Sequence, residues 1–388
     1  MAADYKIEGE CDRRFARVKE AFEANFARDA EVGAAVSVTL DGRPVVDLWG
    51  GWADAAKTQP WQRDTIVNVY STSKGITAIC AHRLVDQGKI DLDEPVATYW
   101  PEFAQARKAT LPVRYLLSHR AGLPAIRKPL DDATFLNWQA MCTALAEQEP
   151  WWRPGTRHGY HAMTFGWLVG EVVRRVSGKA TFSAYLRDEI AGPLGLDCHI
   201  GLGPEHDART AEMIPARPKA GEPNPFAEMA KDPESVSAKT FGNPGILNRP
   251  GFVNTRAWRA AELPAGNAHT NARALARLYG ALARGGELDG VRVLSPDALE
   301  RCWTEQSFGR DEVLMLASRF SAGFMLSQSG AMMGPNTHTF GHPGAGGSLG
   351  FADPKARIGF GYTMNRMNLG LLIDERAVPL IEAVYASL

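Results

Sequence analysis

Apolar residues recur every three or four positions in several stretches of the chain, and segments rich in glycine and proline separate these stretches. Between residues 12 and 26 this periodicity, with charged residues at the other positions, predicts an amphipathic helix. The same pattern predicts further helices over 76–87, 113–117, 134–148, 163–176, 182–190, 271–284, 296–303 and 374–387.

A second pattern, of alternating or β-branched residues, is typical of strands. At 34–49 it lies on both sides of the turn Asp41-Gly42-Arg43-Pro44 and predicts a β-hairpin. Short runs of the same character predict a strand just before Ser71 and strands at 320–327, 337–342, 348–353 and 357–364.

The predicted strands thus lie near both ends of the chain, and most predicted helices lie between them. This order favours an α/β (α+β) fold in which an antiparallel sheet, flanked by helices, is built from both chain termini and a mainly helical domain is inserted. Because 388 residues are too many for one ordinary core, we place the sheet domain at 1–70 and 265–388 and the helical domain at 71–264. Residues 216–264 are rich in proline and glycine and show little periodicity, so a long surface loop covering one side of a functional site is predicted there.

The composition limits the possible partners. The formal net charge is -1 and no long run of one sign occurs, so there is no electrostatic support for binding nucleic acid or an anionic membrane. The five cysteines lie far apart without a C-x-x-C pair, which is typical of reduced, mostly buried thiols in a cytoplasmic protein (Cys11, Cys80, Cys142, Cys198 and Cys302). The N-terminal stretch is acidic without an apolar segment, so no signal peptide is expected, and no membrane span, metal or cofactor is expected either.

The candidate chemistry begins at Ser71-Thr72-Ser73-Lys74, where a β-branched run ends and helical spacing starts. Residues three apart share a helix face, so the Lys74 amine can reach the Ser71 hydroxyl. A serine becomes nucleophilic when a neighbouring base takes its proton, and a lysine excluded from water can serve as that base. The N–H groups of the first helical turn favour the negative charge of an acyl-transfer intermediate. The pattern fixes only two residues, however, and an ordinary helix-capping serine is the alternative.

A turn-rich loop at 154–162 delivers Tyr160 just before a predicted helix. A flanking lysine cation would lower the pKa of the phenol and let its oxygen share the base role. The alternative is a tyrosine that packs its ring and forms a hydrogen bond through its hydroxyl.

A glycine-rich stretch at 340–348 is expected to let a ligand or another backbone approach closely. Pro343 has no N–H and confines this segment to an edge or the start of a strand. There the N–H of Ala345 can form an oxyanion hole together with the N–H of Ser71. The alternative is a glycine-rich turn between strands.

These three stretches together resemble the motifs of the serine β-lactamase and penicillin-binding-protein superfamily, and most closely its class C-like branch with the family VIII carboxylesterases. The matching elements are Ser71-x-x-Lys74, a tyrosine in a Pro-Gly-Thr loop, and Gly341-His342-x-Gly344 near the C-terminus. Supporting stretches lie at Leu116–Pro124, Pro193–Leu196 and Gly266–Gly286, so the resemblance covers most of the chain. It implies a serine beta-lactamase/transpeptidase-like fold.

The resemblance also implies roles. Ser71 would be the acylated nucleophile, Lys74 its proton partner, and Tyr160 the general base that returns the proton to the leaving group. Ala345 would supply the second oxyanion N–H, beside that of Ser71. His342 and Gly344, in the third motif, would contact the substrate.

Two departures from the family pattern bear on the substrate. Ala162 replaces the asparagine of the usual Tyr-x-Asn, and His342 replaces the lysine that begins the third motif. A fixed positive charge for a substrate carboxylate thereby becomes a group that is mostly neutral at pH 7. Both changes favour a neutral ester over a penicillin-like acid.

We therefore expect a serine carboxylesterase acting on small, short-acyl esters. Aromatic residues near the motifs are candidates for an apolar pocket, although tryptophans are more often core residues (Trp151, Trp152, Trp258 and Phe252). Alternatives with the same active-site parts are a β-lactamase, a D-amino-acid peptidase, an acyltransferase and an amide hydrolase. An alternative of another class is a non-catalytic relative that assembles or binds.

Two other kinds of site have little support. His158, His161 and His342 could form a metal site, but His-x-x-His lacks the helical i, i+4 spacing and the adjacent glutamate of zinc hydrolases, so we expect His158 and His161 to form hydrogen bonds in their loop. A nucleophile elbow is the other, and we set it aside although Gly346-Gly347-Ser348-Leu349-Gly350 has the spacing G-x-S-x-G.

Overall fold

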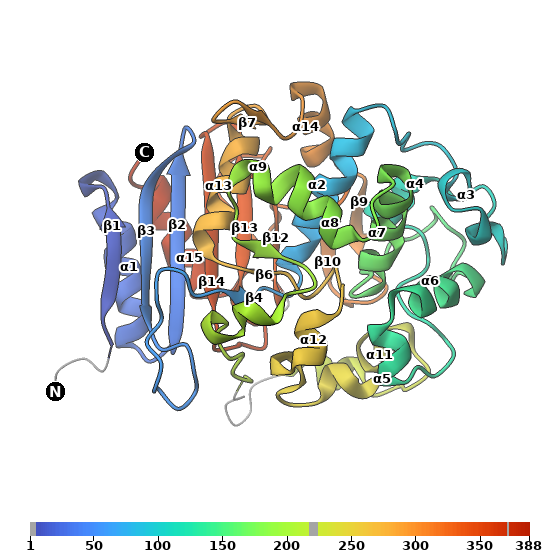
Figure 1. Cartoon of the computed structure of the whole chain (residues 1–388), viewed down its shortest axis with the longest axis horizontal. Coiled ribbons are helices and arrows are strands. Elements are labelled where there is room, and N and C mark those ends of the chain that lie inside the picture. Colours follow the sequence, from blue (N-terminus) through green and yellow to red (C-terminus); the bar gives the residue numbers. More distant parts are fainter. Residues whose placement is uncertain (1–4, 217–223, 371) are drawn as a thin grey trace.

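The computed structural model describes residues 5–216, 224–370 and 372–388. Its centre is a nine-stranded sheet in which all neighbouring strands are antiparallel (Figure 1). In spatial order the strands are β1 (Ile7–Cys11), β3 (Arg43–Gly51), β2 (Gly33–Leu40), β14 (Ile358–Met364), β13 (Leu349–Asp353), β12 (Phe340–Pro343), β11 (Met325–Leu326), β10 (Ala317–Phe320) and β9 (Ser307–Arg310). Since β2 pairs directly with β14, the two ends of the chain meet within the sheet. This confirms the predicted fold, whereas the domain division at residues 70 and 265 stays a prediction.

Helices cover both faces of this sheet. α1 (Ala16–Ala27) and α15 (Ala377–Tyr385) pack together behind it in the view of Figure 1, and α13 (Ala272–Ala283) lies in front. α13 approaches β14 closely because glycines face it. An added Cβ on Gly359 would lie 2.2 Å from the backbone nitrogen of Gly280 and 2.4 Å from the carbonyl oxygen of Ala276.

The remaining helices lie beside the sheet, around α2 (Thr72–Asp86). Twelve of its fifteen residues are buried, and it packs against α7 and β12, so it is a core helix with no solvent face. The other elements are α3 (Val96–Tyr99), α4 (Val113–Leu117), α5 (Asp132–Leu136), α6 (Trp138–Glu147), α7 (Thr164–Ser177), α8 (Phe182–Leu186), α9 (Gly192–Leu194) and α14 (Pro296–Trp303), a small sheet of β4 (Val67–Asn68), β6 (His269–Thr270) and β5 (Cys198–His199), and a hairpin of β7 (Glu287–Leu288) and β8 (Val291–Arg292).

The prediction of one long loop at 216–264 is wrong in part, and residues 217–223 lie outside the described residues. The segment contains the short helices α10 (Pro225–Met229), α11 (Val236–Gly242) and α12 (Arg256–Ala260). Each begins at a side chain that caps its first turn, namely Asn224, Ser235 and Thr255. Helices of five or seven residues are too short to show a repeating apolar pattern.

Other differences have similar causes. The predicted strand at 320–327 is divided into β10 and β11 by a tight turn in which Gly323 adopts a φ of 99°. β1 and β9 were not predicted, because they are short edge strands. All five cysteines are free thiols and four are buried, as predicted. In the part of the chain that the structure describes, none of the helices combines the length and apolar character that crossing a membrane requires.

The contact between α13 and β14 gives a test of the fold. Gly359→Ala would place a methyl group against the backbone of α13, and we expect it to lower the free energy of unfolding by about 1–3 kcal/mol. Exposed Gly245, with open space around its Cβ position, provides the control, and Gly245→Ala should change the free energy of unfolding by less than about 0.5 kcal/mol. Chemical denaturation measures both variants, and equal stabilities would contradict this packing of α13 on the sheet.

Candidate active site

Ser71 lies where the chain turns from β4 into α2. Tyr70 adopts a φ of 42°, which is rare for a residue with a side chain, and Thr72 is the first helical residue. The Ser71 hydroxyl makes no capping hydrogen bond to the helix. The helix-cap alternative is therefore wrong, and the hydroxyl is available for other contacts.

Lys74 lies one turn further along α2 and is completely buried. Its Nζ is 3.0 Å from Ser71 Oγ and donates a hydrogen bond of 2.9 Å to the carbonyl oxygen of Ala265. Burial holds the pKa of Lys74 well below its usual value. In its neutral form an amine in this position can donate one N–H to the Ala265 carbonyl and present its lone pair to the Ser71 hydroxyl.

Tyr160 is the third member of this cluster. Lys74 Nζ lies 4.7 Å from the centroid of its ring, and the phenol forms a hydrogen bond with Ser71. Burial raises the pKa of Tyr160 above its usual value, and the hydrogen bond with Ser71 only partly opposes this effect. The sequence-based expectation that a lysine cation lowers the pKa of Tyr160 is wrong, because the lysine itself is desolvated. The phenol is protonated at neutral pH.

Asp311, which the sequence did not single out, holds the Tyr160 loop. Its Oδ1 accepts hydrogen bonds from the backbone N–H groups of Tyr160, Val313 and Leu314 at 3.0, 2.8 and 2.9 Å. Its Oδ2 accepts a hydrogen bond from Ser318 Oγ, which lies 3.0 Å from His158 Nε2. The Asp311 side chain is fully buried. Its neighbours in sequence do not reveal its link to the site, because Tyr160 lies 151 residues away along the chain.

Two buried histidines pack beside Tyr160. His119 Nδ1 accepts a hydrogen bond from the backbone N–H of His161, and its ring centroid lies 5.1 Å from that of Tyr160. His161 Nε2 accepts a hydrogen bond from Leu123 N–H, and its Nδ1 donates to the carbonyl oxygen of Gly159. Burial lowers the pKa of His119 well below its usual value and that of His161 to about 3. Both rings are thus neutral, and His158 and His161 form hydrogen bonds as predicted.

His342 on β12 faces the same cluster, with its ring centroid 6.0 Å from that of Tyr160. Its Nδ1–H donates to the carbonyl oxygen of Pro343 at 2.7 Å, which leaves Nε2 as an acceptor. That Nε2 is buried and has no hydrogen-bond partner among the described residues. Burial, and then the nearby Lys74, lowers the pKa of His342 to about 3, so this side chain is uncharged at pH 7.

The prediction that Pro343 places its segment at an edge or the start of a strand needs correction. β12 lies between β13 and β11, and Pro343 is its last residue. β11 has only two residues and pairs with Phe340 and Gly341, so His342 and Pro343 have no β11 partner. The strand is internal to the sheet, but this end of it has a free side.

The turn after β12 lies directly against the residues that precede Ser71. An added Cβ on Gly344 would lie 2.2 Å from the carbonyl oxygen of Val69, and Ser348 Oγ donates a hydrogen bond of 2.8 Å to that oxygen. Gly344 is thus needed for a close approach of two backbones. The N–H groups of Ser71 and Ala345 donate no hydrogen bond to any described residue, and both residues are partly exposed.

The four candidate pocket residues divide into two groups. Trp152 is half-buried near the Tyr160 loop, with its ring centroid 6.3 Å from that of His161, and half-buried Trp151 donates from Nε1 to the carbonyl oxygen of Ala125. Trp258 is fully buried, and its Nε1 donates to Asn68 Oδ1, while half-buried Phe252 packs against it. Trp258 is therefore a core residue, the alternative that the sequence favoured for any one tryptophan, and it anchors α12 on β4.

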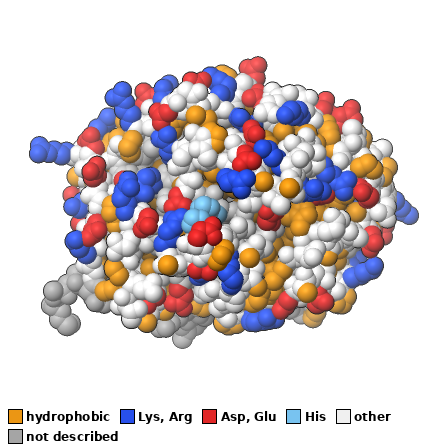
Figure 2. All heavy atoms as spheres, viewed as in Figure 1, with side chains coloured by type: hydrophobic (Ala, Val, Ile, Leu, Met, Phe, Trp, Pro, Cys, Tyr) orange, Lys and Arg blue, Asp and Glu red, His pale blue; other side chains and the backbone are white. Residues whose placement is uncertain are grey.

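Charged side chains of both signs are interspersed over the face shown in Figure 2, in keeping with the net charge of -1. Among the described residues, no group of three His, Cys, Asp or Glu side chains is placed to hold a metal ion.

The comparisons with known proteins agree in one family. The model of the Beta-lactamase family matches residues 18–380. A Mycobacterium tuberculosis protein named Esterase/beta-lactamase LipL is 37% identical over 382 residues, which cover 97% of this chain and 86% of the relative. A solved family VIII carboxylesterase superposes with a TM-score of 0.89 at 42% identity, covering 99% of this chain and 100% of the other. A penicillin-binding-protein homologue from Caulobacter crescentus gives a TM-score of 0.90 at 41% identity with the same coverage.

The contacts of Asp311 give a second prediction. Asp311→Ala leaves three buried N–H groups without an acceptor, and we expect it to lower the free energy of unfolding by about 3 kcal/mol or more. Asp311→Asn keeps the Oδ1 acceptor, and Ser318 can donate to His158 instead, so the loss should be much smaller. Denaturation curves of both variants test this, and equal losses would show that acceptance by Oδ1 is not what holds the loop.

Proposed function

The chain belongs to the beta-lactamase family and is a serine hydrolase of that family, and from this premise we propose that it is a carboxylesterase that hydrolyses small, short-acyl esters through an acyl-enzyme on Ser71. The names of its relatives, an esterase/beta-lactamase and a family VIII carboxylesterase, support the reaction class. The free and mostly buried cysteines support a cytoplasmic location, which is also part of the proposal.

One observation carries the proposal: a desolvated lysine amine lies 3.0 Å from a serine oxygen that has no other structural task. In the first step the Lys74 lone pair takes the Ser71 proton while Ser71 Oγ attacks the ester carbonyl carbon. The bond between carbon and Oγ forms as the carbonyl double bond opens, and the carbonyl oxygen becomes an oxyanion.

The N–H groups of Ser71 and Ala345 bind this oxyanion in the proposed mechanism. Both are without an acceptor among the described residues and both belong to backbone that packing fixes, so they need no rearrangement when charge develops. Each such donor contributes about 100- to 1,000-fold to the rate in enzymes of this chemistry.

Tyr160 then completes the proton path. Its phenol is protonated and lies against both Ser71 and Lys74, so it can give its proton to the departing alkoxide and regain one from the Lys74 ammonium. The tetrahedral intermediate collapses, the alcohol leaves, and the acyl group stays on Ser71. Water enters by the same steps in reverse and releases the carboxylic acid.

The neutral character of the site supports an ester as substrate. His342 carries no charge at pH 7 and offers an acceptor nitrogen, and Ala162 offers no polar group. A substrate carboxylate would find no fixed cation among these residues, whereas a neutral ester needs none. β-Lactam hydrolysis is the second candidate, because the name of one relative includes it.

The central prediction concerns Ser71 itself. A fluorophosphonate probe should add once to the wild-type protein, and Ser71→Ala should show no adduct by intact-mass spectrometry. A short-chain nitrophenyl ester should be turned over at least about 100-fold faster than a chromogenic cephalosporin. An adduct that persists in the alanine variant, or no adduct in the wild type, would refute the mechanism and favour a non-catalytic relative.

A further prediction concerns Lys74 and pH. Because burial depresses the pKa of Lys74, kcat/KM should rise with pH through that depressed pKa and reach a plateau well below pH 10. Lys74→Arg keeps a permanent cation that cannot take a proton, and kcat/KM should fall by about 100- to 10,000-fold at all pH values. A rate that climbs steadily to pH 10 in the wild type would mean that Lys74 is not the base.

A further inference from the structure

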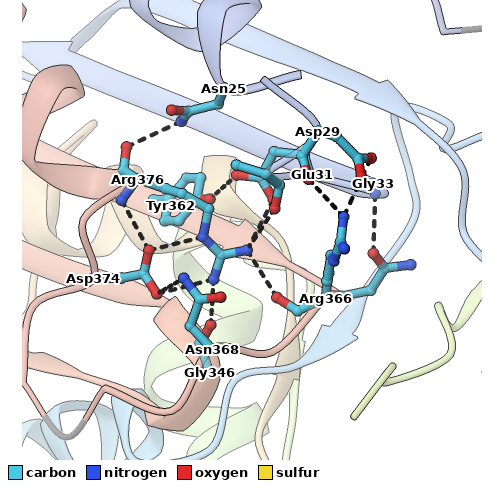
Figure 3. Close-up of polar contacts among 12 residues, drawn as sticks. Asn25, Asp29, Glu31, Gly33, Gly346, Tyr362, Arg366, Asn368, Asp374 and Arg376 are labelled. Carbon is cyan, nitrogen blue, oxygen red and sulfur yellow. Dashed lines mark hydrogen bonds and ion pairs between the residues drawn. The ribbon is translucent and has the colours of Figure 1, made fainter. Parts of the chain in front are cut away.

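Behind the turn that carries Ala345 lies a buried guanidinium, that of Arg376 at the start of α15 (Figure 3). The side chain is completely buried, which is rare for arginine. Its Nε and Nη2 donate to the two oxygens of Asp374, and its Nη1 donates to Glu31 and to the carbonyl oxygen of Arg366. Glu31 in turn accepts a hydrogen bond from the hydroxyl of Tyr362 on β14.

One further contact of Arg376 leads out of this cluster. Nη2 also donates to the carbonyl oxygen of Gly346, an oxygen that accepts a second hydrogen bond from the backbone N–H of Asn368 at 3.1 Å. Gly346 and Gly347 adopt φ values of 86° and 132°, which few other residues tolerate. A Cβ on Gly347 would lie 2.5 Å from Nη2, so the guanidinium lies directly beneath the turn.

From Gly346 the hydrogen bonds continue in one direction toward Ser71. The peptide group that carries the Gly346 oxygen also carries the Gly347 N–H, which donates to the carbonyl oxygen of Gly344 at 3.0 Å. The next peptide group carries that Gly344 oxygen and the Ala345 N–H. In a trans peptide the C=O and N–H point in opposite directions, so the chain runs head to tail from Arg376 to Ala345.

Such a chain has two physical effects. It fixes the planes of both peptide groups and so fixes the direction of the Ala345 N–H. It also polarises them, because each hydrogen bond that a carbonyl accepts makes the N–H of the same peptide a stronger donor, by about 10–30% per bond. A guanidinium at the far end gives the strongest polarisation available from a side chain.

We propose that Arg376 is a positioning residue for the oxyanion hole, and that it orients and polarises the Ala345 N–H through the peptide groups 346–347 and 344–345. This inference rests on the proposed function, in which Ala345 N–H binds the oxyanion. Arg376 touches no substrate, since it is buried behind the turn.

The test compares Arg376→Lys with Tyr362→Phe. Lysine keeps the charge, but its single ammonium group cannot donate hydrogen bonds to the Gly346 carbonyl and to both Asp374 oxygens in the planar geometry of a guanidinium. Tyr362→Phe removes a hydrogen bond from the same buried cluster and leaves the contact of Arg376 with Gly346 intact. Both variants should lower the melting temperature, because each removes hydrogen bonds from the same buried cluster. A merely structural role of Arg376 therefore predicts the same change in kcat and in boronate affinity for both.

Two quantities are measured: kcat and KM on a nitrophenyl ester, and the affinity for phenylboronic acid. The tetrahedral adduct of this acid on a serine mimics the oxyanion. With active sites titrated by a fluorophosphonate, Arg376→Lys should lower kcat about 10-fold or more, weaken boronate binding in parallel, and change KM less than about 2-fold. Tyr362→Phe should change kcat and boronate affinity less than about 3-fold.

Equal effects of the two variants, or an unchanged boronate affinity in Arg376→Lys, would overturn the proposal. If Arg376→Lys does not fold, Asp374→Asn, which weakens the hydrogen bonds that orient the guanidinium, is measured in the same way. An unchanged boronate affinity in Asp374→Asn would then overturn the proposal. Failure of the proposed function has a different signature, because the wild type itself would then form no adduct on Ser71.

Discussion

The structure of the site depends on keeping water and countercharge away from the Lys74 amine. An ammonium group is strongly hydrated, and in a protein interior it stays charged only beside a carboxylate or several acceptors. Lys74 has the Ala265 carbonyl, the Ser71 hydroxyl and the face of the Tyr160 ring around it, and burial alone lowers its pKa. This requires a helix with no solvent face, and α2 meets that requirement because helices and the sheet enclose it.

The same constraint explains the histidines that surround the site. His119, His161 and His342 are polar, yet backbone hydrogen bonds fix their tautomers and burial lowers their pKa values, so they add no charge near the amine. The Asp311 carboxylate, beside Tyr160, accepts hydrogen bonds from three backbone N–H groups and from the Ser318 hydroxyl. A site made of neutral polar groups offers no charge to compensate a charged substrate for its desolvation. Exclusion of charge from the site thus favours both a neutral Lys74 as the base and a neutral ester as the substrate.

The sequence predicted the parts of the fold and site that local patterns encode. The amphipathic helix at α1, the hairpin of β2 and β3, and the three-residue spacing of Ser71 and Lys74 all depend on residues within one or two turns of each other. Asp311 and the burial of Trp258 depend on contacts between distant segments, which no periodicity reports. The short helices at 225–260 were missed because a capped turn of five residues leaves no repeat. The pKa of Tyr160 was misjudged for a related reason: the charge state of Lys74 follows from its burial, which is a tertiary property.

Burial of Arg376 with two carboxylates calls for an explanation other than stability. Removing such charges from water costs several kcal/mol per ion, and apolar replacements of buried ion pairs are often neutral or stabilising. Burial raises the pKa of Glu31 to about 7 even beside the guanidinium, so the cluster does not fully compensate the desolvation of Glu31. What the cluster does provide is geometry. It ties α15, the segment between α1 and β2, and β14 to a glycine-rich turn that has no polar side chain of its own to hold it. The nucleophile and its base come from one turn of chain at the start of α2, whereas Tyr160 and the second oxyanion donor need support from distant parts of the chain. For the oxyanion donor, a planar group of charged donors at the Gly346 carbonyl gives that support with little freedom of movement.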